Sequence, residues 1–172
     1  APLNVGASEI SAGGRLREIT VLGSTADLIP IRHMDLSAGA FHASIRANAA
    51  EIVLGATLAS QLFPAGNAVG QRVQLGDRRF RVAAIFVRQG ESQGFNTDEI
   101  ALIPVDHAQS LFNTESLFRI LIEAESRSAI DRVKRGVTEK LRLRHDGEAD
   151  VTVITQDAIL STFDRILRAL TL

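Results

Sequence analysis

With 172 residues, a hydrophobic fraction of 45%, a charged fraction of 23% and a net charge of -1, the chain has the composition of an ordinary globular protein. The near-neutral charge and the lack of Trp and Tyr argue against a nucleic-acid partner, which needs positive charge and aromatic stacking surfaces. The lack of Cys excludes disulfides, thiolate metal sites and cysteine nucleophiles. The residues given contain no signal peptide and no apolar run of about 18 residues, so they predict no membrane span of their own.

The N-terminal part of the chain predicts a β-hairpin. Residues 2–10 and 16–22 alternate weakly between apolar and polar positions, and the glycines between them, Gly13 and Gly14, favour a turn. Ile19 and Val21 give the second strand a face toward a core.

Residues 23–50 show a less regular pattern. Pro30 is expected to interrupt any helix that begins near Ala26, because proline lacks a backbone N–H and restricts the residue before it. Phe41 is a candidate core anchor. The small and polar residues 43–50 predict a surface connection.

The strongest local patterns lie in residues 51–90. An apolar run at residues 52–54 predicts a buried strand, and a short amphipathic helix follows and stops at Pro64. The period then changes to two. Val73 and Leu75 share one face, a two-residue turn follows at residues 76–77, and the next strand alternates through Phe80, Val82 and Phe86.

Residues 89–98, QGESQGFNTD, predict a loop because two glycines and several turn formers lie between strands. Loops on a rigid scaffold often carry function, so this loop is the candidate partner-facing surface. Its candidate residues are Gln89, Glu91, Gln93, Phe95 and Asn96.

The last third of the chain predicts a strand–helix–strand unit. A buried strand at residues 100–103 and a short helix at 105–112 precede it. Strands at residues 118–123 and 151–154 flank a helix, and a right-handed βαβ connection would make them parallel. The class is therefore α+β.

The helix of this unit is expected to begin at Ser128, which has capping-box spacing to Asp131. An apolar stripe then runs along one side of the helix through Ile130, Val133, Val137 and Leu141. A final helix is expected at residues 158–172.

The ordered elements resemble a known family. The matching segments are VLG followed by A..LFP, AVGQ.V.LG...FRV, IPVDHAQSLF, RILIEAES, LRLRHDGEADVTVITQ and ILSTFDRIL. Together they resemble the MacB-like periplasmic core domain of ABC-transporter permeases, over most of the chain and in the family's order.

The resemblance implies two subdomains. A porter-like split βαβ layer would comprise residues 1–28 and 113–172, interrupted by a small α/β insertion at residues 29–112. Family members usually carry a further strand and helix before the segment that matches Ala1, so the porter-like sheet is expected to have an open edge for pairing with another chain. The family also places this domain between two transmembrane helices, so the chain is expected to be an excised fragment.

Two clusters of polar residues are candidates for a catalytic or metal-binding site. Asp106 and His107 are adjacent on a short helix, where neighbours do not face each other, so a helix cap is favoured over an acid–base pair. The group at residues 145–148 holds His, Asp and Glu, but its spacing fits no common zinc or calcium motif and favours a polar turn. His33 and His42 stand alone and are interpreted as ordinary surface or core histidines.

Two glycine-containing segments resemble phosphate-binding loops only slightly. Gly23, Ser24 and Thr25 after a strand, and Gly55 before a helix, lack the second glycine and the lysine of a phosphate-binding loop, which favours tight turns. No nucleotide, cofactor or metal site is therefore expected.

A basic cluster lies on the predicted long helix and favours a solvated face over a docking surface for an acidic partner. Its members are Arg127, Arg132, Lys134, Arg135, Lys140, Arg142 and Arg144. The final helix is apolar on two faces, and the family places a transmembrane helix directly after it. Residues 161–172 are therefore interpreted as a membrane-proximal stalk, with Phe163, Ile166, Leu167 and Leu170 as its apolar residues.

Together these expectations describe the extracytoplasmic domain of an ABC-transporter permease, on the periplasmic side of the inner membrane. It would not be an enzyme, because ATP hydrolysis would lie in a separate cytoplasmic domain, and it would couple ATP-driven motion to substrate export or partner engagement. The implied partners are a second permease chain, the ATPase domain, a periplasmic adaptor and an outer-membrane channel.

Two alternatives stay open. One is the domain of a lipoprotein-releasing permease that binds a lipoprotein or its carrier. The other is a stand-alone small-ligand-binding or hydrolytic domain, which would show a deep pocket with converging titratable groups.

Overall fold

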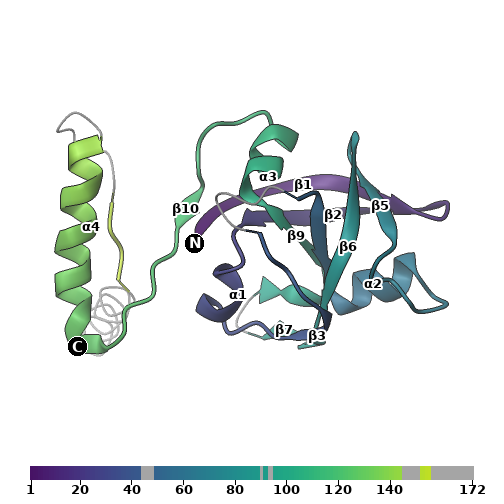
Figure 1. Ribbon diagram of the computed structural model, residues 1–172, viewed down its shortest axis with the longest axis horizontal. Coiled ribbons are helices and arrows are strands. Elements are labelled where there is room, and N and C mark those ends of the chain that lie inside the picture. Colours follow the sequence, from purple (N-terminus) through teal and green to yellow (C-terminus); the bar gives the residue numbers. More distant parts are fainter. Residues whose placement is uncertain (44–48, 90, 93–94, 145–151, 156–172) are drawn as a thin grey trace, which may run out of the picture. The chain divides into compact units, whose positions relative to one another are not determined.

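The computed structural model describes residues 1–43, 49–89, 91–92, 95–144 and 152–155. By its internal contacts the chain divides into two units, Ala1–Ile122 and Glu123–Leu172. The first unit holds a strand-rich mixed sheet with short helices, and the second holds one long helix among its described residues (Figure 1). This agrees with the mixed class expected from the sequence.

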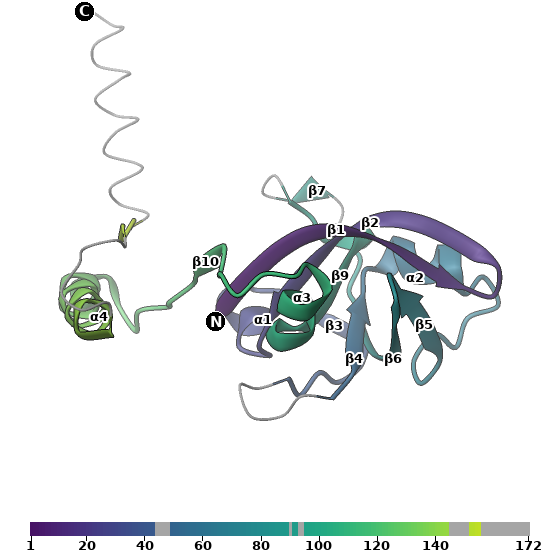
Figure 2. The ribbon, with the colours of Figure 1, turned by 90° about the horizontal axis from the view of Figure 1, so that it is seen from above.

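The predicted N-terminal hairpin is confirmed. Strand β1 (Pro2–Ala12) pairs with β2 (Arg15–Ser24) in antiparallel register from Leu3 opposite Ser24 to Ala12 opposite Arg15. The turn residues Gly13 and Gly14 have φ values of 54° and 79°, which glycine adopts without a steric penalty. The two strands form a long curved ribbon across the first unit (Figure 2).

Six strands of the first unit close into a ring. Strand β2 pairs in parallel with β9 (Ile100–Pro104), β9 pairs with β4 (Glu51–Leu54), and β4 pairs in parallel with β6 (Arg78–Phe86). The predicted hairpin of β5 (Arg72–Leu75) with β6 is confirmed, with a turn at Gly76 and Asp77. A short ladder between β5 and β1 then completes the ring.

The inside of this ring is filled by apolar side chains, which we call the inner core. Helix α2 (Ala56–Leu62), predicted from the sequence, contributes Leu58, Ala59 and Leu62 to it. The strands contribute the inward-facing residues Ile10, Ile19, Val21, Ile52, Leu54, Val73, Leu75, Phe80, Val82 and Ile103, among others.

A second apolar cluster, the outer core, lies on the other face of the central strands. It forms because a β-bulge changes the side on which β6 side chains point: Ile52 lies opposite Val82, but Val53 lies opposite Ala84. Phe86 therefore packs in the outer core, although Phe80 and Val82 pack in the inner core. The simple alternation predicted for this strand is thus wrong after Val82.

The covering layer of the outer core comes from residues 26–43. It contains α1 (Leu28–Ile31), Met34, β3 (Leu36–Gly39) on the edge of β6, and the predicted anchor Phe41. The expectation that Pro30 would prevent a helix is wrong. Pro30 lies in the first turn of α1, where its missing N–H removes no helical hydrogen bond.

Helix α3 (Val105–Leu111), also predicted, packs on the β1–β2 ribbon (Figure 1). Two glycines permit the close approach. A Cβ at Gly6 would lie 2.4 Å from the Phe112 ring, and a Cβ at Gly23 would lie 2.1 Å from the Cβ of Ala108.

The predicted strand at residues 118–123 is much shorter than expected. Only β10 (Arg119–Ile120) pairs with β1, opposite Leu3 and Pro2. The Ala1 ammonium donates to the Leu121 carbonyl at 2.7 Å, and burial lowers the pKa of this amino group from its ordinary value.

In the second unit, a 3-10 turn, η2 (Arg127–Ala129), leads into α4 (Ile130–Arg144). The predicted capping box at Ser128 is wrong, because Ser126 is the residue that precedes the helical turns and no side chain caps them. The apolar stripe is confirmed: within α4 the half-buried side chains are Ile130, Val133, Val137 and Leu141.

The predicted parallel βαβ unit is not formed by the described residues. Residues 152–154, the described part of its second strand, belong to no strand. The predicted final helix at residues 158–172 lies outside the described residues. The subdomain division at residues 28 and 113 stays a prediction.

Candidate partner-facing loop

The loop at residues 89–98 has more internal structure than the sequence predicts. Strand β7 (Glu91–Ser92) pairs antiparallel with β8 (Phe95–Asn96), with Glu91 opposite Asn96 and Ser92 opposite Phe95. A 3-10 turn, η1 (Thr97–Glu99), then leads into β9. The predicted loop is therefore a miniature hairpin rather than an irregular connection.

A buried carboxylate holds the base of this hairpin. Asp98 is only 6% exposed, and its Oδ1 accepts a hydrogen bond of 3.0 Å from the backbone N–H of Gln89. The Oδ1 of Asn96 in turn accepts a bond of 2.9 Å from the N–H of Asp98. The first bond ties together both ends of the hairpin, because Gln89 precedes it and Asp98 follows it, and the second holds the turn at Asp98.

Gly55 fixes the base against the ring. A Cβ at this position would lie 2.3 Å from the carbonyl oxygen of Asp98 and 2.5 Å from that of Thr97. The Gly55 N–H also donates to the Ile100 carbonyl at 2.8 Å. Gly55 thus serves a close backbone approach, in agreement with the turn that was favoured over a phosphate cradle.

The predicted partner-facing residues divide into three groups. Gln89 is exposed, and Asn96 is half-buried with its amide oxygen directed to its own backbone. Glu91 and Phe95 are placed by their backbone in the hairpin, while Gln93 lies outside the described residues. The stalk residues Phe163, Ile166, Leu167 and Leu170 also lie outside them.

Sequence reasoning missed Asp98 and the role of Asn96. The signal that could have found them is Asn96-Thr97-Asp98 directly before a buried apolar run, since Asn commonly caps a helical turn through the N–H two residues later.

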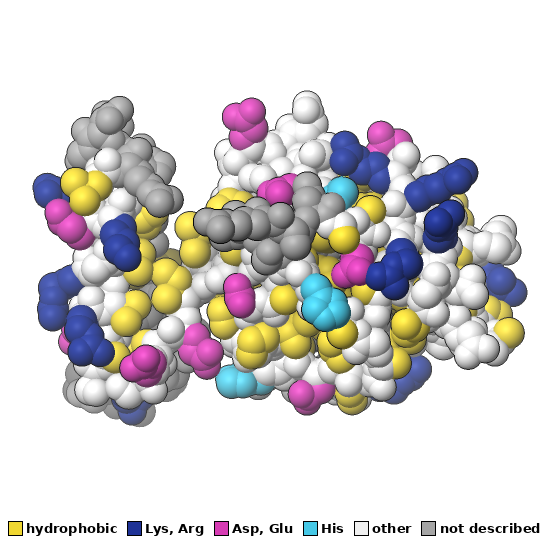
Figure 3. Space-filling model, viewed as in Figure 1, with side chains coloured by type: hydrophobic (Ala, Val, Ile, Leu, Met, Phe, Trp, Pro, Cys, Tyr) yellow, Lys and Arg dark blue, Asp and Glu magenta, His cyan; other side chains and the backbone are white. Residues whose placement is uncertain are grey.

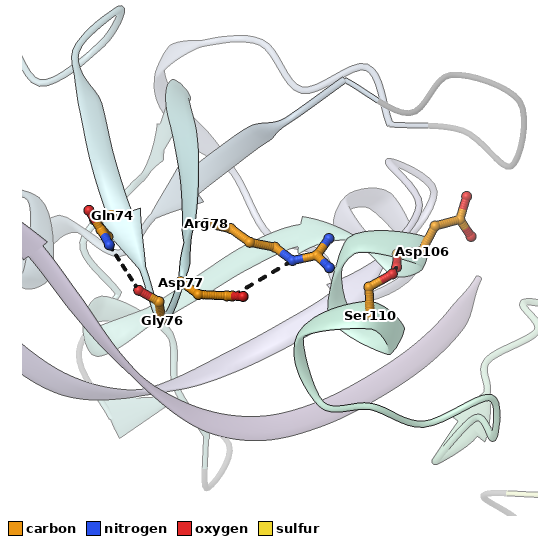
Figure 4. Close-up of polar contacts among 6 residues, drawn as sticks. All are labelled: Gln74, Gly76, Asp77, Arg78, Asp106 and Ser110. Atoms are coloured by element: carbon orange, nitrogen blue, oxygen red, sulfur yellow. Dashed lines mark hydrogen bonds and ion pairs between the residues drawn. The ribbon is translucent and has the colours of Figure 1, made fainter.

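The helix cap that the sequence favours at Asp106 and His107 is not formed, because Pro104 occupies the N-cap position of α3 and no side chain caps the helix. The Ser110 hydroxyl donates to the Asp106 carbonyl at 2.9 Å, while the Asp106 carboxylate extends away from the helix (Figure 4). The His107 ring packs edge-on against Phe80, with ring centroids 5.3 Å apart and an interplanar angle of 75°.

The hydroxyls of the other proposed cradle are already engaged. Ser24 Oγ donates to the Pro2 carbonyl, and Thr25 Oγ1 donates to Asp27 at 3.1 Å. Gly23 is required by the contact of its strand with α3, as described above. Gly23 and Ser24 lie within β2, so the tight turn that the sequence favours at these residues is wrong.

Two other groups from the sequence can be placed in part. In the basic cluster, Arg142 lies 3.4 Å from Glu139, and the exposed side chains that the structure describes are Arg127, Arg132, Lys134, Arg135, Lys140 and Arg142. Exposure fits both a solvated face and a docking surface, so the preference for a solvated face stays a prediction. His33 and His42 are exposed, and residues 145–148 lie outside the described part.

The described part of the chain contains neither a metal-ligating cluster nor a membrane-spanning helix. There, no three His, Asp or Glu side chains come together in a way that could hold a metal ion. Among the helices that the structure describes, none combines the length and hydropathy that a membrane crossing requires.

Comparison with known proteins identifies relatives by sequence. The profile of the MacB-like periplasmic core domain matches residues 1–140. The chain is 27% identical over 133 residues to the macrolide export ATP-binding/permease protein MacB of Nitrobacter winogradskyi, which covers 74% of this chain and 21% of that protein. It is 28% identical over 127 residues to the pyoverdine export ATP-binding/permease protein PvdT of Pseudomonas entomophila, covering 72% and 19%. The chain thus spans only about a fifth of the length of these relatives.

Solved structures share the fold. The periplasmic region of MacB from Actinobacillus actinomycetemcomitans aligns with a TM-score of 0.74 at 16% identity, covering 95% of this chain and 74% of that one. The extracellular domain of the transporter YknZ from Gram-positive bacteria aligns with a TM-score of 0.72 at 15% identity, covering 90% and 79%. At these identities the likeness concerns the fold alone.

Proposed function

The chain belongs to the family of MacB-like periplasmic core domains, and from this premise we propose that it is the extracytoplasmic domain of an ABC-transporter permease with a role in export. The observation that carries the proposal is the family match over residues 1–140. The export functions in the names of the relatives, for macrolides and pyoverdine, support the same role.

We propose a mechanical and not a catalytic role for this domain. ATP would be hydrolysed in a separate cytoplasmic domain, and the motion would reach this domain through the membrane part of the permease. The closed ring of six strands supports this role, because its paired strands and filled interior let the first unit move as one body. Residues 161–172, with the apolar residues named above, would form the stalk that transmits the motion.

The proposed partners are a second permease chain, the ATP-binding domain, and a periplasmic adaptor with its outer-membrane channel. The hairpin at residues 89–98 is our proposed contact with an extracytoplasmic partner. Its anchored base supports this choice, because a contact loop tied down by Asp98 loses little conformational freedom when it binds.

The test is a distance measurement in the full-length permease that contains this chain, reconstituted in lipid nanodiscs. A spin label at Glu18→Cys, an exposed position of β2, would be the only cysteine in the domain, and cysteines elsewhere in the permease would be replaced. Electron spin resonance then measures the label-to-label distance between two copies, without nucleotide and with ATP trapped by vanadate. We expect two different distance distributions.

A label at Gln71→Cys, exposed at the start of the β5–β6 hairpin, is the matched second position. If the domain moves as one body, both labels shift on trapping. Identical distributions with and without nucleotide at both positions would refute the coupling role. If no label-to-label distance is detected at either position, the proposed pairing with a second permease chain is refuted.

A further inference from the structure

A groove on the first unit carries unpaired positive charge. Its volume is about 510 Å³, and it lies where the end of the β1–β2 hairpin passes the edge of β5. One wall is the hairpin turn from Ser11 to Leu16, and the other comprises Arg72, Val73, Gln74 and Arg79. None of these lining residues, all of which the structure describes, is acidic.

Three arginines of the groove have no anionic partner among the described residues. Arg15, Arg72 and Arg79 are exposed and take part in no ion pair. Two other arginines of β6 do have acidic partners: Arg78 lies 3.8 Å from Asp77 (Figure 4), and Arg81 is bound by Glu51.

The strand register concentrates this charge. Arg72 lies directly opposite Arg81, and Arg79 lies opposite the neutral Gln74. Glu51 already balances the charge of Arg81, so neither Arg72 nor Arg79 faces a free carboxylate across this ladder, and each can pair with an added anion. Arginine side chains gather on the part of the first unit that lies over β5, β6 and the β1–β2 hairpin (Figure 3).

The backbone around the groove favours an extended peptide over a small anion. The ladder between β1 and β5 ends at Ser11 opposite Gln74, so Val73 and Arg72 have no partner on β1. An unpaired strand edge can bind an added strand through main-chain hydrogen bonds. Leu16, 53% exposed, adds an apolar wall for a side chain of that strand.

We propose that this groove binds an extended acidic segment of a partner protein, in which carboxylates alternate with apolar residues. The carboxylates would pair with Arg15, Arg72 and Arg79, and the apolar side chains would pack on Leu16. This binding surface is distinct from the hairpin at residues 89–98. It also does not depend on a transport role, so a chain that failed the distance test above could still bind such a segment.

The experiment measures fluorescence anisotropy of a short labelled peptide of alternating Glu and Val, titrated with the 172-residue chain at low salt. We expect saturable binding that weakens as salt is added, because exposed ion pairs are screened. The double variant Arg72→Gln/Arg79→Gln should weaken binding roughly tenfold, about threefold for each lost exposed pair. The matched control, Arg32→Gln/Arg88→Gln, replaces two exposed arginines outside the groove and should leave binding unchanged.

Two further peptides test separately whether binding needs the carboxylates and whether it needs main-chain pairing with β5. A Gln/Val peptide should bind at least tenfold more weakly if the carboxylates matter. A Glu/Val peptide with alternate backbone nitrogens methylated should also lose affinity, because it cannot pair with the edge of β5.

Equal binding of the methylated peptide, with displacement by millimolar inorganic sulfate, would make the groove a simple anion site and overturn the proposal. No binding by the unaltered chain, or equal losses in the groove and control variants, would also overturn it. The salt dependence of the unaltered chain needs no variant, so the proposal stays testable if a variant folds poorly.

Discussion

The two units of the chain are stabilised in different ways. In Ala1–Ile122, side chains from strands distant in sequence fill an inner and an outer core, and many of them are fully buried. In the second unit, no described side chain of α4 is buried, and its apolar stripe is half-exposed. The order of the first unit therefore depends on non-local packing, whereas α4, with no fully buried side chain, relies more on the helix propensity of its own residues.

This difference predicts that substitutions will act on the two units separately and in different amounts. Amide hydrogen exchange read by mass spectrometry is the suitable measurement, because it reports each unit by itself. Fluorescence is less suitable, since the chain contains no Trp or Tyr.

The largest effect is expected for Phe80→Ala. Phe80 is 1% exposed, packs in the inner core and contacts His107. Removing its ring should lower the free energy of unfolding of the first unit by about 4 kcal/mol, through lost burial and the remaining cavity. The most protected amides of β6 and β9 should then exchange about a thousandfold faster.

The matched control is Phe118→Ala, which removes the same ring from a position that is 64% exposed. Its cost should stay below about 0.5 kcal/mol. In both variants the amides of α4 should keep their exchange rates. Faster exchange in α4 after Phe80→Ala would contradict the separate origin of order in the two units.

A smaller effect is expected for Gly55→Ala. The φ of Gly55 is -62°, which alanine adopts readily, so the cost comes only from the collision of the new Cβ with the backbone of η1. We expect a loss of about 2 kcal/mol in the first unit. Because η1 carries the base of the hairpin, the amides of Gln89 and Asp98 should show the first increase in exchange.

An unchanged exchange rate at Gln89 and Asp98 in this variant would mean that the base does not rest on Gly55. Loss of protection throughout the first unit, with no earlier change at the hairpin, would mean that the hairpin is part of the global fold. Either result would contradict a separate anchoring of the hairpin through Gly55.

Much of the first unit follows from local sequence patterns. The strands at residues 52–54 and 100–103, the hairpin turn at residues 76–77 and the helix that stops before Pro64 were all predicted, because each is encoded within a few residues. What could not be predicted depends on distant partners. The ring closure joins Ile10 to Leu75, and the bulge at Ala83 is visible only in the register of β6 against β4.

The candidate sites divide in the same way. The position of the hairpin at residues 89–98 was predicted from its glycines and turn formers, but its buried anchor Asp98 was not, because burial depends on the packing of Gly55. The groove was missed completely. Arg15 and Arg72 are far apart in the sequence, and only the β1–β5 ladder brings their segments together.

The smallest effect is expected for Gly136→Ala in α4, which is also the control for the glycine substitution above. A Cβ at Gly136 would meet no atom of the described residues within 4 Å, so the substitution should act only through helix propensity. Alanine should stabilise the helix by about 0.8 kcal/mol, which slows amide exchange in α4 roughly fourfold and leaves β6 and β9 unchanged. Faster exchange in α4 would mean that the new methyl group collides with a neighbouring segment packed on Gly136. The stability of α4 would then depend on packing, as the stability of the first unit does.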